Sequence, residues 1–114
     1  MESADTAHLA VEAASDKLAS DIVLLDVRSV CGFADYFVIC SAESERQIGA
    51  VVEEIDRTLT DNGVRLYRSE GTPDSGWVLM DLGDVIVHIF SPEQRSFYKL
   101  EDLWAKAVPL VHLQ

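Results

Sequence analysis

The sequence is poor in the features that mark secreted, metal-binding or membrane proteins. Its only cysteines, Cys31 and Cys40, lack the C-x-x-C spacing of zinc and redox sites. No apolar run approaches the roughly 20 residues of a membrane-spanning helix. Acids stand at the N-terminus, where a secretory signal needs Lys or Arg. We therefore expect a cytoplasmic protein with no disulfide, metal ion, cofactor or membrane contact.

Basic residues are also scarce. There are 9 Lys and Arg against 20 Asp and Glu, which gives a formal net charge of -11. Such a surface repels a phosphate backbone at long range, so we expect little direct contact with nucleic acid. If the protein works near RNA, the better inference is docking on a basic protein, steered by acidic side chains. The alternative is that the acidity only keeps a small domain soluble.

Common catalytic motifs are absent as well. The chain has no Gly-rich phosphate loop and no H-E-x-x-H, G-x-S-x-G or EF-hand pattern. A cysteine beside His88 would form a nucleophile and base pair. However, His88 lies in the apolar run Val85–Phe90, which favours a hydrogen-bonded structural histidine. Two residues separate Asp81 from Asp84 across a turn, unlike the Asp-x-Asp pair of nucleotidyltransferases. We expect a protein that is not an enzyme, with a nucleotidyltransferase-type enzyme as the alternative.

Length and composition indicate one globular domain. The 114 residues are 48% apolar and 25% charged, which suffices for one hydrophobic core. We predict a single domain over residues 1–114, folded over about 6–108 and frayed at the C-terminal end. The predicted elements are a helix over 6–20, strands over 22–27 and 35–40, a helix over 44–62, a strand over 64–68, a loop over 69–76, strands over 77–82 and 85–90, and a helix from 91. This order predicts an α/β (α+β) fold with a single mixed five-stranded sheet and helices packed on it.

The helix after Ser44 has the clearest local signals. Ser44-Glu45-Arg46-Gln47 fits the S-x-x-Q capping box, and apolar residues recur at helical spacing from Ile48 to Leu59. Gly63 ends the pattern, because glycine adopts the left-handed conformation at little cost. Ser91-Pro92-Glu93-Gln94 repeats the capping pattern and predicts the start of the last helix.

The segment Trp77–Phe90 is predicted to be a β-hairpin, because two apolar runs meet at Gly83-Asp84. Asp81 and Asp84 are expected to cap its turn. Strand alternation places Trp77, Leu79 and Asp81 on one face. A face that combines tryptophan with aspartate is expected to be partly open, and tryptophan is enriched at binding hot spots. Both a partner contact and core packing remain open for Trp77.

Four runs of the chain, in this order, carry a resemblance to a known family. They are Ala34–Ile39, Glu70–Gly71, Trp77–His88 and Phe97–Trp104. Together they resemble the ribosomal silencing factor family, also called the Iojap or RsfS family, from about Ile22 to Trp104. Cys31-Gly32-Phe33 fits no pattern of the family. The resemblance implies a nucleotidyltransferase-like topology without the active site of those enzymes.

The resemblance also implies a function. A member would bind the large ribosomal subunit through ribosomal protein fourteen of that subunit, block association with the small subunit, and lower translation under nutrient limitation. It would form a homodimer when free, and the dimer would compete with ribosome binding if both used the same face. Resemblance and expected exposure together place the contact on Glu70, Gly71, Trp77, Leu79, Asp81 and Tyr98, with Asp35 and His88 as weaker candidates. A generic acidic adaptor for another basic protein is a further alternative.

Overall fold

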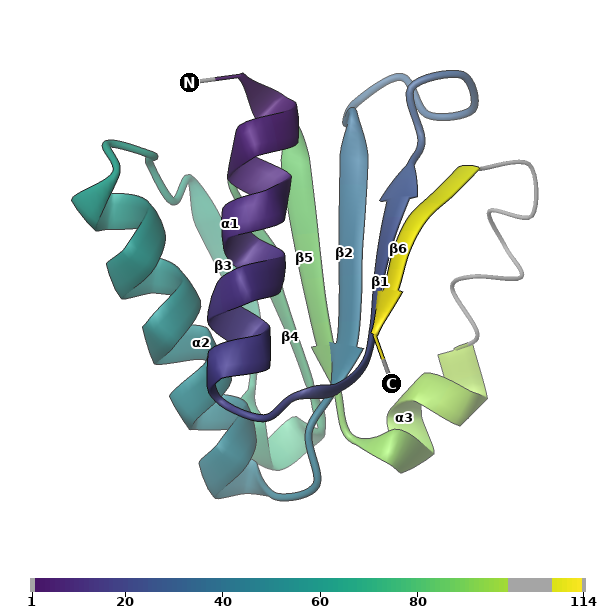
Figure 1. The fold of residues 1–114 in the computed structure, drawn as a ribbon. Helices are drawn as coiled ribbons and strands as arrows, with labels where there is room; N and C mark the ends of the chain where they lie inside the picture. Colours follow the sequence, from purple (N-terminus) through teal and green to yellow (C-terminus); the bar gives the residue numbers. More distant parts are fainter. Residues whose placement is uncertain (1, 99–107, 114) are drawn as a thin grey trace.

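The fold is a mixed sheet with two helices on one face (Figure 1). The computed structural model describes residues 2–98 and 108–113. Its elements are α1 (Ser3–Asp16), β1 (Ser20–Asp26), β2 (Tyr36–Ser41), α2 (Glu45–Asp61), β3 (Arg68–Thr72), the 3-10 turn η1 (Pro73–Ser75), β4 (Trp77–Asp81), β5 (Val85–Phe90), α3 (Pro92–Tyr98) and β6 (Val108–Leu113). Among the described strands the order is β3-β4-β5-β2-β1-β6.

The parallel pair β2 and β5 forms the centre of the sheet. Both strands are buried at every position, which explains their continuous apolar sequences. One side of the sheet packs against α1 and α2. The apolar stripe of α2 on that side includes Ile48, Val51 and Ile55. Figure 1 shows both helices in front of the strands. The mixed α+β architecture is confirmed.

The caps of α2 follow the sequence closely. The Gln47 N–H donates to Ser44 Oγ at 3.1 Å, as predicted. The Gln47 side chain, in contrast, accepts from the backbone N–H of Glu43, at 2.6 Å, and not from that of Ser44. Gly63 follows the helix with φ +79°. By bonding Glu43, one residue before Ser44, the Gln47 side chain attaches the connection between β2 and α2 to the helix.

The predicted β4–β5 hairpin is confirmed. Gly83 adopts φ +94° in its turn, and the Gly83 N–H donates to Asp81 Oδ1 at 2.9 Å. The Asp84 carbonyl accepts from the Asp35 N–H at 2.7 Å. The hairpin turn is thus attached to the connector that leads into β2. The β1–β2 connection is long, as expected, and these two strands pair antiparallel.

The predicted strand over 64–68 was wrong. The strand β3 occupies Arg68–Thr72, so it shares only Arg68 with the predicted strand and otherwise lies in the segment 69–76 that was predicted to be a loop. The three-residue turn η1 joins it to β4, so Thr72 pairs with Trp77. Alternation in the Val64–Arg68 stretch suggested a strand there. Pairing with β4 fixes the actual strand, because an edge strand gains most of its backbone hydrogen bonds from its neighbour.

A sixth strand corrects the predicted frayed end. β6 pairs antiparallel with β1, with Pro109 opposite Leu25. Proline is tolerated at position 109 because β6 is an edge strand, and one side of an edge strand needs no ladder donor. Asp21 connects this edge to α3. It accepts from Arg95 through its carbonyl and contacts His112 of β6 through its carboxylate.

Gly71 allows a direct test of the β3–β4 pairing. It has φ +80°, and a Cβ added there would lie 2.1 Å from the Trp77 carbonyl oxygen. We expect Gly71→Ala to lower the free energy of unfolding by about 3 kcal/mol or more, since strain and a backbone clash add. Gly63→Ala is the matched control, because it has φ +79° but no atom within 4 Å of the added Cβ. Gly63→Ala should lower the free energy of unfolding by about 1 kcal/mol. Urea unfolding measures both, and equal losses would contradict the packing.

Candidate partner-binding face

Strand pairing arranges the side chains on the side of the sheet opposite α1 and α2 in rows. Directly paired residues of neighbouring strands point to the same face. The three rows, each beginning at β3, are Thr72, Trp77, Phe90 and Ser41; Glu70, Leu79, His88, Ile39 and Val23; and Arg68, Asp81, Ile86, Phe37 and Leu25. Four predicted contact residues from two strands, Glu70, Trp77, Leu79 and Asp81, therefore lie in the three adjacent rows.

Exposure changes along each row. The β3 residues are exposed, the β4 residues are half-buried, and the residues of β5, β2 and β1 are buried. The accessible part therefore consists of Arg68, Glu70, Thr72, Trp77, Leu79 and Asp81, which we call the β3–β4 face. The expected partial opening of the Trp77 face is confirmed, while Val78 and Met80 on the other face are buried.

Among the described residues, the charges of the β3–β4 face have only weak partners. Arg68 Nη1 lies 3.7 Å from Glu70 Oε1, and these side chains are 59% and 56% exposed. Exposed ion pairs contribute little, about 0 to 1 kcal/mol. One carboxylate oxygen of Asp81 accepts the Gly83 N–H in the hairpin turn. Two acids thus lie beside Leu79, Glu70 across the strand pair and Asp81 further along β4. A basic partner can pair with Glu70 by displacing only its weak, exposed contact with Arg68.

Aromatic rings hold Trp77 in place. Its ring stacks on Phe90, with centroids 5.7 Å apart and planes at 12°, and lies nearly parallel to the His88 ring, with centroids 6.2 Å apart and planes at 15°. Trp77 Nε1–H donates to His88 Nδ1 at 3.4 Å. Burial lowers the pKa of His88 to about 4, so the imidazole is neutral at neutral pH. Its Nδ1 is then an acceptor, provided that the proton resides on Nε2.

The remaining predicted residues lie elsewhere. Gly71 points away from the face by strand alternation, and its role is the close approach to Trp77. His88 is only 6% exposed and lies beneath the face. Asp35 precedes β2, and its carboxylate accepts from Ser3 Oγ at 2.8 Å. Tyr98 is the last residue of α3, and its side chain lies outside the described part of the chain.

Comparison with known proteins identifies the family of this chain. A family model described as "Ribosomal silencing factor during starvation" matches residues 1–114. The chain belongs to the ribosomal silencing factor family. It is 44% identical to the ribosomal silencing factor of Bacillus subtilis over 105 residues, which span 92% of this chain and 88% of that protein. It is 40% identical to that of Halalkalibacterium halodurans over 114 residues, which span 100% and 97%.

A solved structure supports the same assignment. A crystal structure of a protein from Chromobacterium violaceum superposes with a TM-score of 0.89 at 34% identity, covering 92% of this chain and 88% of that one. The resemblance to the family found in the sequence is therefore confirmed. No helix among the described residues has the length and apolar character needed to cross a membrane.

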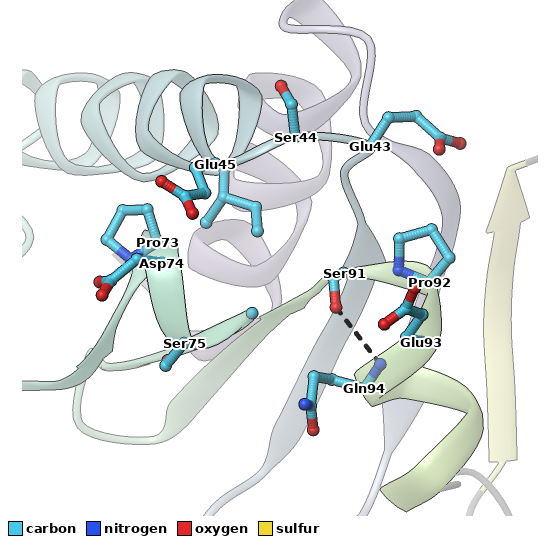
Figure 2. A pocket seen from close by; sticks show the side chains of 12 residues that line it. Glu43, Ser44, Glu45, Pro73, Asp74, Ser75, Ser91, Pro92, Glu93 and Gln94 are labelled. Atoms are coloured by element: carbon cyan, nitrogen blue, oxygen red, sulfur yellow. Dashed lines mark hydrogen bonds between the residues drawn. The ribbon is translucent and has the colours of Figure 1, made fainter.

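A pocket near the end of the β2 strand bears on the enzyme alternative. It has a volume of about 440 Å³ and lies between the N-terminal ends of α2 and α3 and the η1 turn (Figure 2). Its lining includes four carboxylates, from Glu43, Glu45, Asp74 and Glu93, and no Lys or Arg. Such a lining repels nucleotide phosphates. Within the described residues, no three His, Cys, Asp or Glu side chains group closely enough to hold a metal ion.

Arg68 and Thr72 are members of the face that the sequence reading missed. Both were misplaced because β3 was predicted several residues too early. A signal was available, since Pro73–Gly76 is short enough to be a tight turn. Treating it as a turn would have paired the preceding residues with Trp77 and those after it. The period-two rule would then have added Arg68 and Thr72 to Glu70 on the same face.

Proposed function

We propose that this protein lowers translation by binding the large ribosomal subunit and blocking its association with the small subunit. Ribosomal protein fourteen of the large subunit is the proposed docking partner. One observation carries the proposal. In a member of the ribosomal silencing factor family, the β3–β4 face presents half-buried Trp77 and Leu79, with the carboxylates of Glu70 and Asp81 beside Leu79. Aromatic anchors surrounded by polar residues are typical of protein interfaces.

Charge supports a protein partner over direct binding to ribosomal RNA. The net charge of -11 opposes contact with phosphates but attracts a basic protein and accelerates the encounter. Blocking subunit association needs no chemistry. A domain of 33 × 32 × 24 Å bound at a contact surface between subunits excludes the other subunit by its volume. The proposed activity is therefore binding without catalysis, in the cytoplasm where the ribosomes are.

Sedimentation in a sucrose gradient tests the binding step. We expect the protein to migrate with purified large subunits and to stay at the top with small subunits alone. Because acidic side chains steer the complex, higher salt should release the protein. Protein that stays at the top in the presence of large subunits, at low salt, would contradict the proposal. Small subunits serve as the matched control for non-specific adsorption.

The isolated partner separates the proposal from a generic acidic adaptor. Purified ribosomal protein fourteen should bind in a surface-based binding assay, while a different basic ribosomal protein of the large subunit should bind much more weakly. Equal binding of both would favour the adaptor. If the proposed homodimer of the free protein uses the same face, its dissociation must precede ribosome binding. Analytical ultracentrifugation over a range of concentrations measures the dimer directly.

A further inference from the structure

The most unusual group beneath the β3–β4 face is a buried imidazole. His88 lies in the centre of the middle row, between Leu79 of β4 and Ile39 of β2. Apart from His88, the residues buried in the β5 strand are apolar. Burying a polar ring costs free energy unless it is hydrogen-bonded. An aliphatic residue would fill this place without that cost, so the imidazole requires an explanation.

The contacts of His88 are directed at Trp77. The two ring planes lie within 15° of each other, and the Trp77 indole N–H donates to His88 Nδ1. Phe37 approaches the imidazole edge-on, with centroids 5.4 Å apart and planes at 69°. Phe90 stacks on it at 4° with centroids 6.0 Å apart. Neighbouring strands therefore fix the imidazole, and the imidazole in turn provides a hydrogen-bond acceptor for the indole.

We propose that His88 is a positioning residue that holds the Trp77 indole in the orientation in which it docks on the partner. The inference rests on the proposed function for the identity of the partner. At 6% exposure, His88 offers the partner almost no surface of its own. Its effect on binding must therefore pass through Trp77. A side chain that is already immobile loses less conformational entropy when it binds, which strengthens the complex.

Hydrogen exchange tests the contact without the ribosome. The two tryptophan indole N–H signals are distinguished in the NMR spectrum by comparison with Trp77→Phe. In His88→Phe the ring is retained but the acceptor is lost. We expect the Trp77 indole N–H to exchange with solvent about 5-fold faster, which corresponds to about 1 kcal/mol for one hydrogen bond. His8→Phe, at an exposed position of α1, is the matched control and should leave the exchange unchanged.

Binding to purified large subunits tests the consequence. His88→Phe should weaken binding by about 2- to 10-fold, because the freed Trp77 side chain then loses conformational entropy when the complex forms. His8→Phe should bind like the wild type. In the background of Trp77→Ala, His88→Phe should cause no additional loss, because the indole that it positions is gone. Circular dichroism and a urea titration establish that each variant is folded, and His88→Leu replaces His88→Phe if the larger ring prevents folding.

The outcomes separate the two proposals. Unchanged exchange in His88→Phe would overturn the positioning role, as would wild-type affinity of His88→Phe or a loss that adds fully to that of Trp77→Ala. A purely structural histidine gives that additive result, since a weakened fold lowers binding with or without the indole. If the wild type fails to bind large subunits, the proposed function fails, and the exchange experiment alone decides whether His88 holds Trp77.

Discussion

Trp77→Ala is expected to weaken binding to the large ribosomal subunit by at least about 30-fold, the effect of losing a hot spot of about 2 kcal/mol. The structure gives the reason. Trp77 is half-buried at the β3–β4 face and is held by stacking on Phe90 and by a hydrogen bond to His88. A large ring that is already fixed provides apolar contact area at a small entropic cost. Titration of labelled protein with purified large subunits measures the loss.

The control for this substitution is another apolar side chain far from the face. Leu18 is 80% exposed in the turn between α1 and β1, and Leu18→Ala should leave the affinity unchanged. Trp77→Ala must also retain its fold, which circular dichroism and urea unfolding establish. A folded Trp77→Ala protein with the affinity of the wild type would show that the β3–β4 face is not the docking surface. An equal loss in Leu18→Ala would point to a different face.

The stability of the protein is expected to fall in mild acid because of His88. Burial lowers the pKa of its imidazole from 6.5 to about 4, so the unfolded chain binds a proton more readily than the folded one. The contribution of neutral His88 is fully present above pH 6.5 and is lost progressively as the pH falls towards 4. Linkage predicts a loss of about 2 kcal/mol in the free energy of unfolding between pH 7 and pH 5. Urea titrations at both pH values measure it.

His88→Phe isolates this contribution from the titration of the many carboxylates. The difference in stability between pH 7 and pH 5 should be smaller in the variant by about 2 kcal/mol, because Phe cannot take up a proton. His112→Phe is a useful comparison, since His112 is exposed on β6 and is paired with Asp21. The same pH dependence in wild type and His88→Phe would contradict a neutral, buried imidazole.

The face follows from the sequence only as far as its strands have strong local signals. Trp77, Leu79 and Asp81 were placed together correctly, because β4 alternates with period two and the Gly83 turn fixes where the hairpin reverses. The buried strands β2 and β5 were equally clear from their continuous apolar runs. Local pattern is sufficient where a strand has both a buried face and a defined end.

The two edge strands show where sequence patterns fail. β3 is exposed at every position, and β6 has only one half-buried residue, so neither has the apolar alternation that identifies a strand. β3 is positioned by pairing with β4, to which the turn η1 joins it. β6 is positioned by pairing with β1, at the other end of the sequence. Sequence spacing does not provide that register. Arg68 was consequently missed as a member of the face, and the close approach of Gly71 to the Trp77 carbonyl was not foreseen.

His88 illustrates a different limit. The apolar run around it correctly predicted a structural, hydrogen-bonded histidine, but not the identity of its partner. That partner, Trp77, is 11 residues away on the neighbouring strand. The hydrogen bond depends on a register in which Leu79 lies opposite His88 and Trp77 lies opposite Phe90. A polar residue in an apolar strand thus indicates that a partner exists, and the fold then identifies it.

Subunit association is the most direct test of the proposed silencing activity. Light scattering follows the joining of purified small and large subunits after mixing, with increasing amounts of the protein bound to the large subunit beforehand. We predict that the wild type lowers the amount of joined ribosome in proportion to the large subunits occupied, and that folded Trp77→Ala at the same concentration has little effect. Full joining of subunits while the wild-type protein occupies the large subunit would contradict the account.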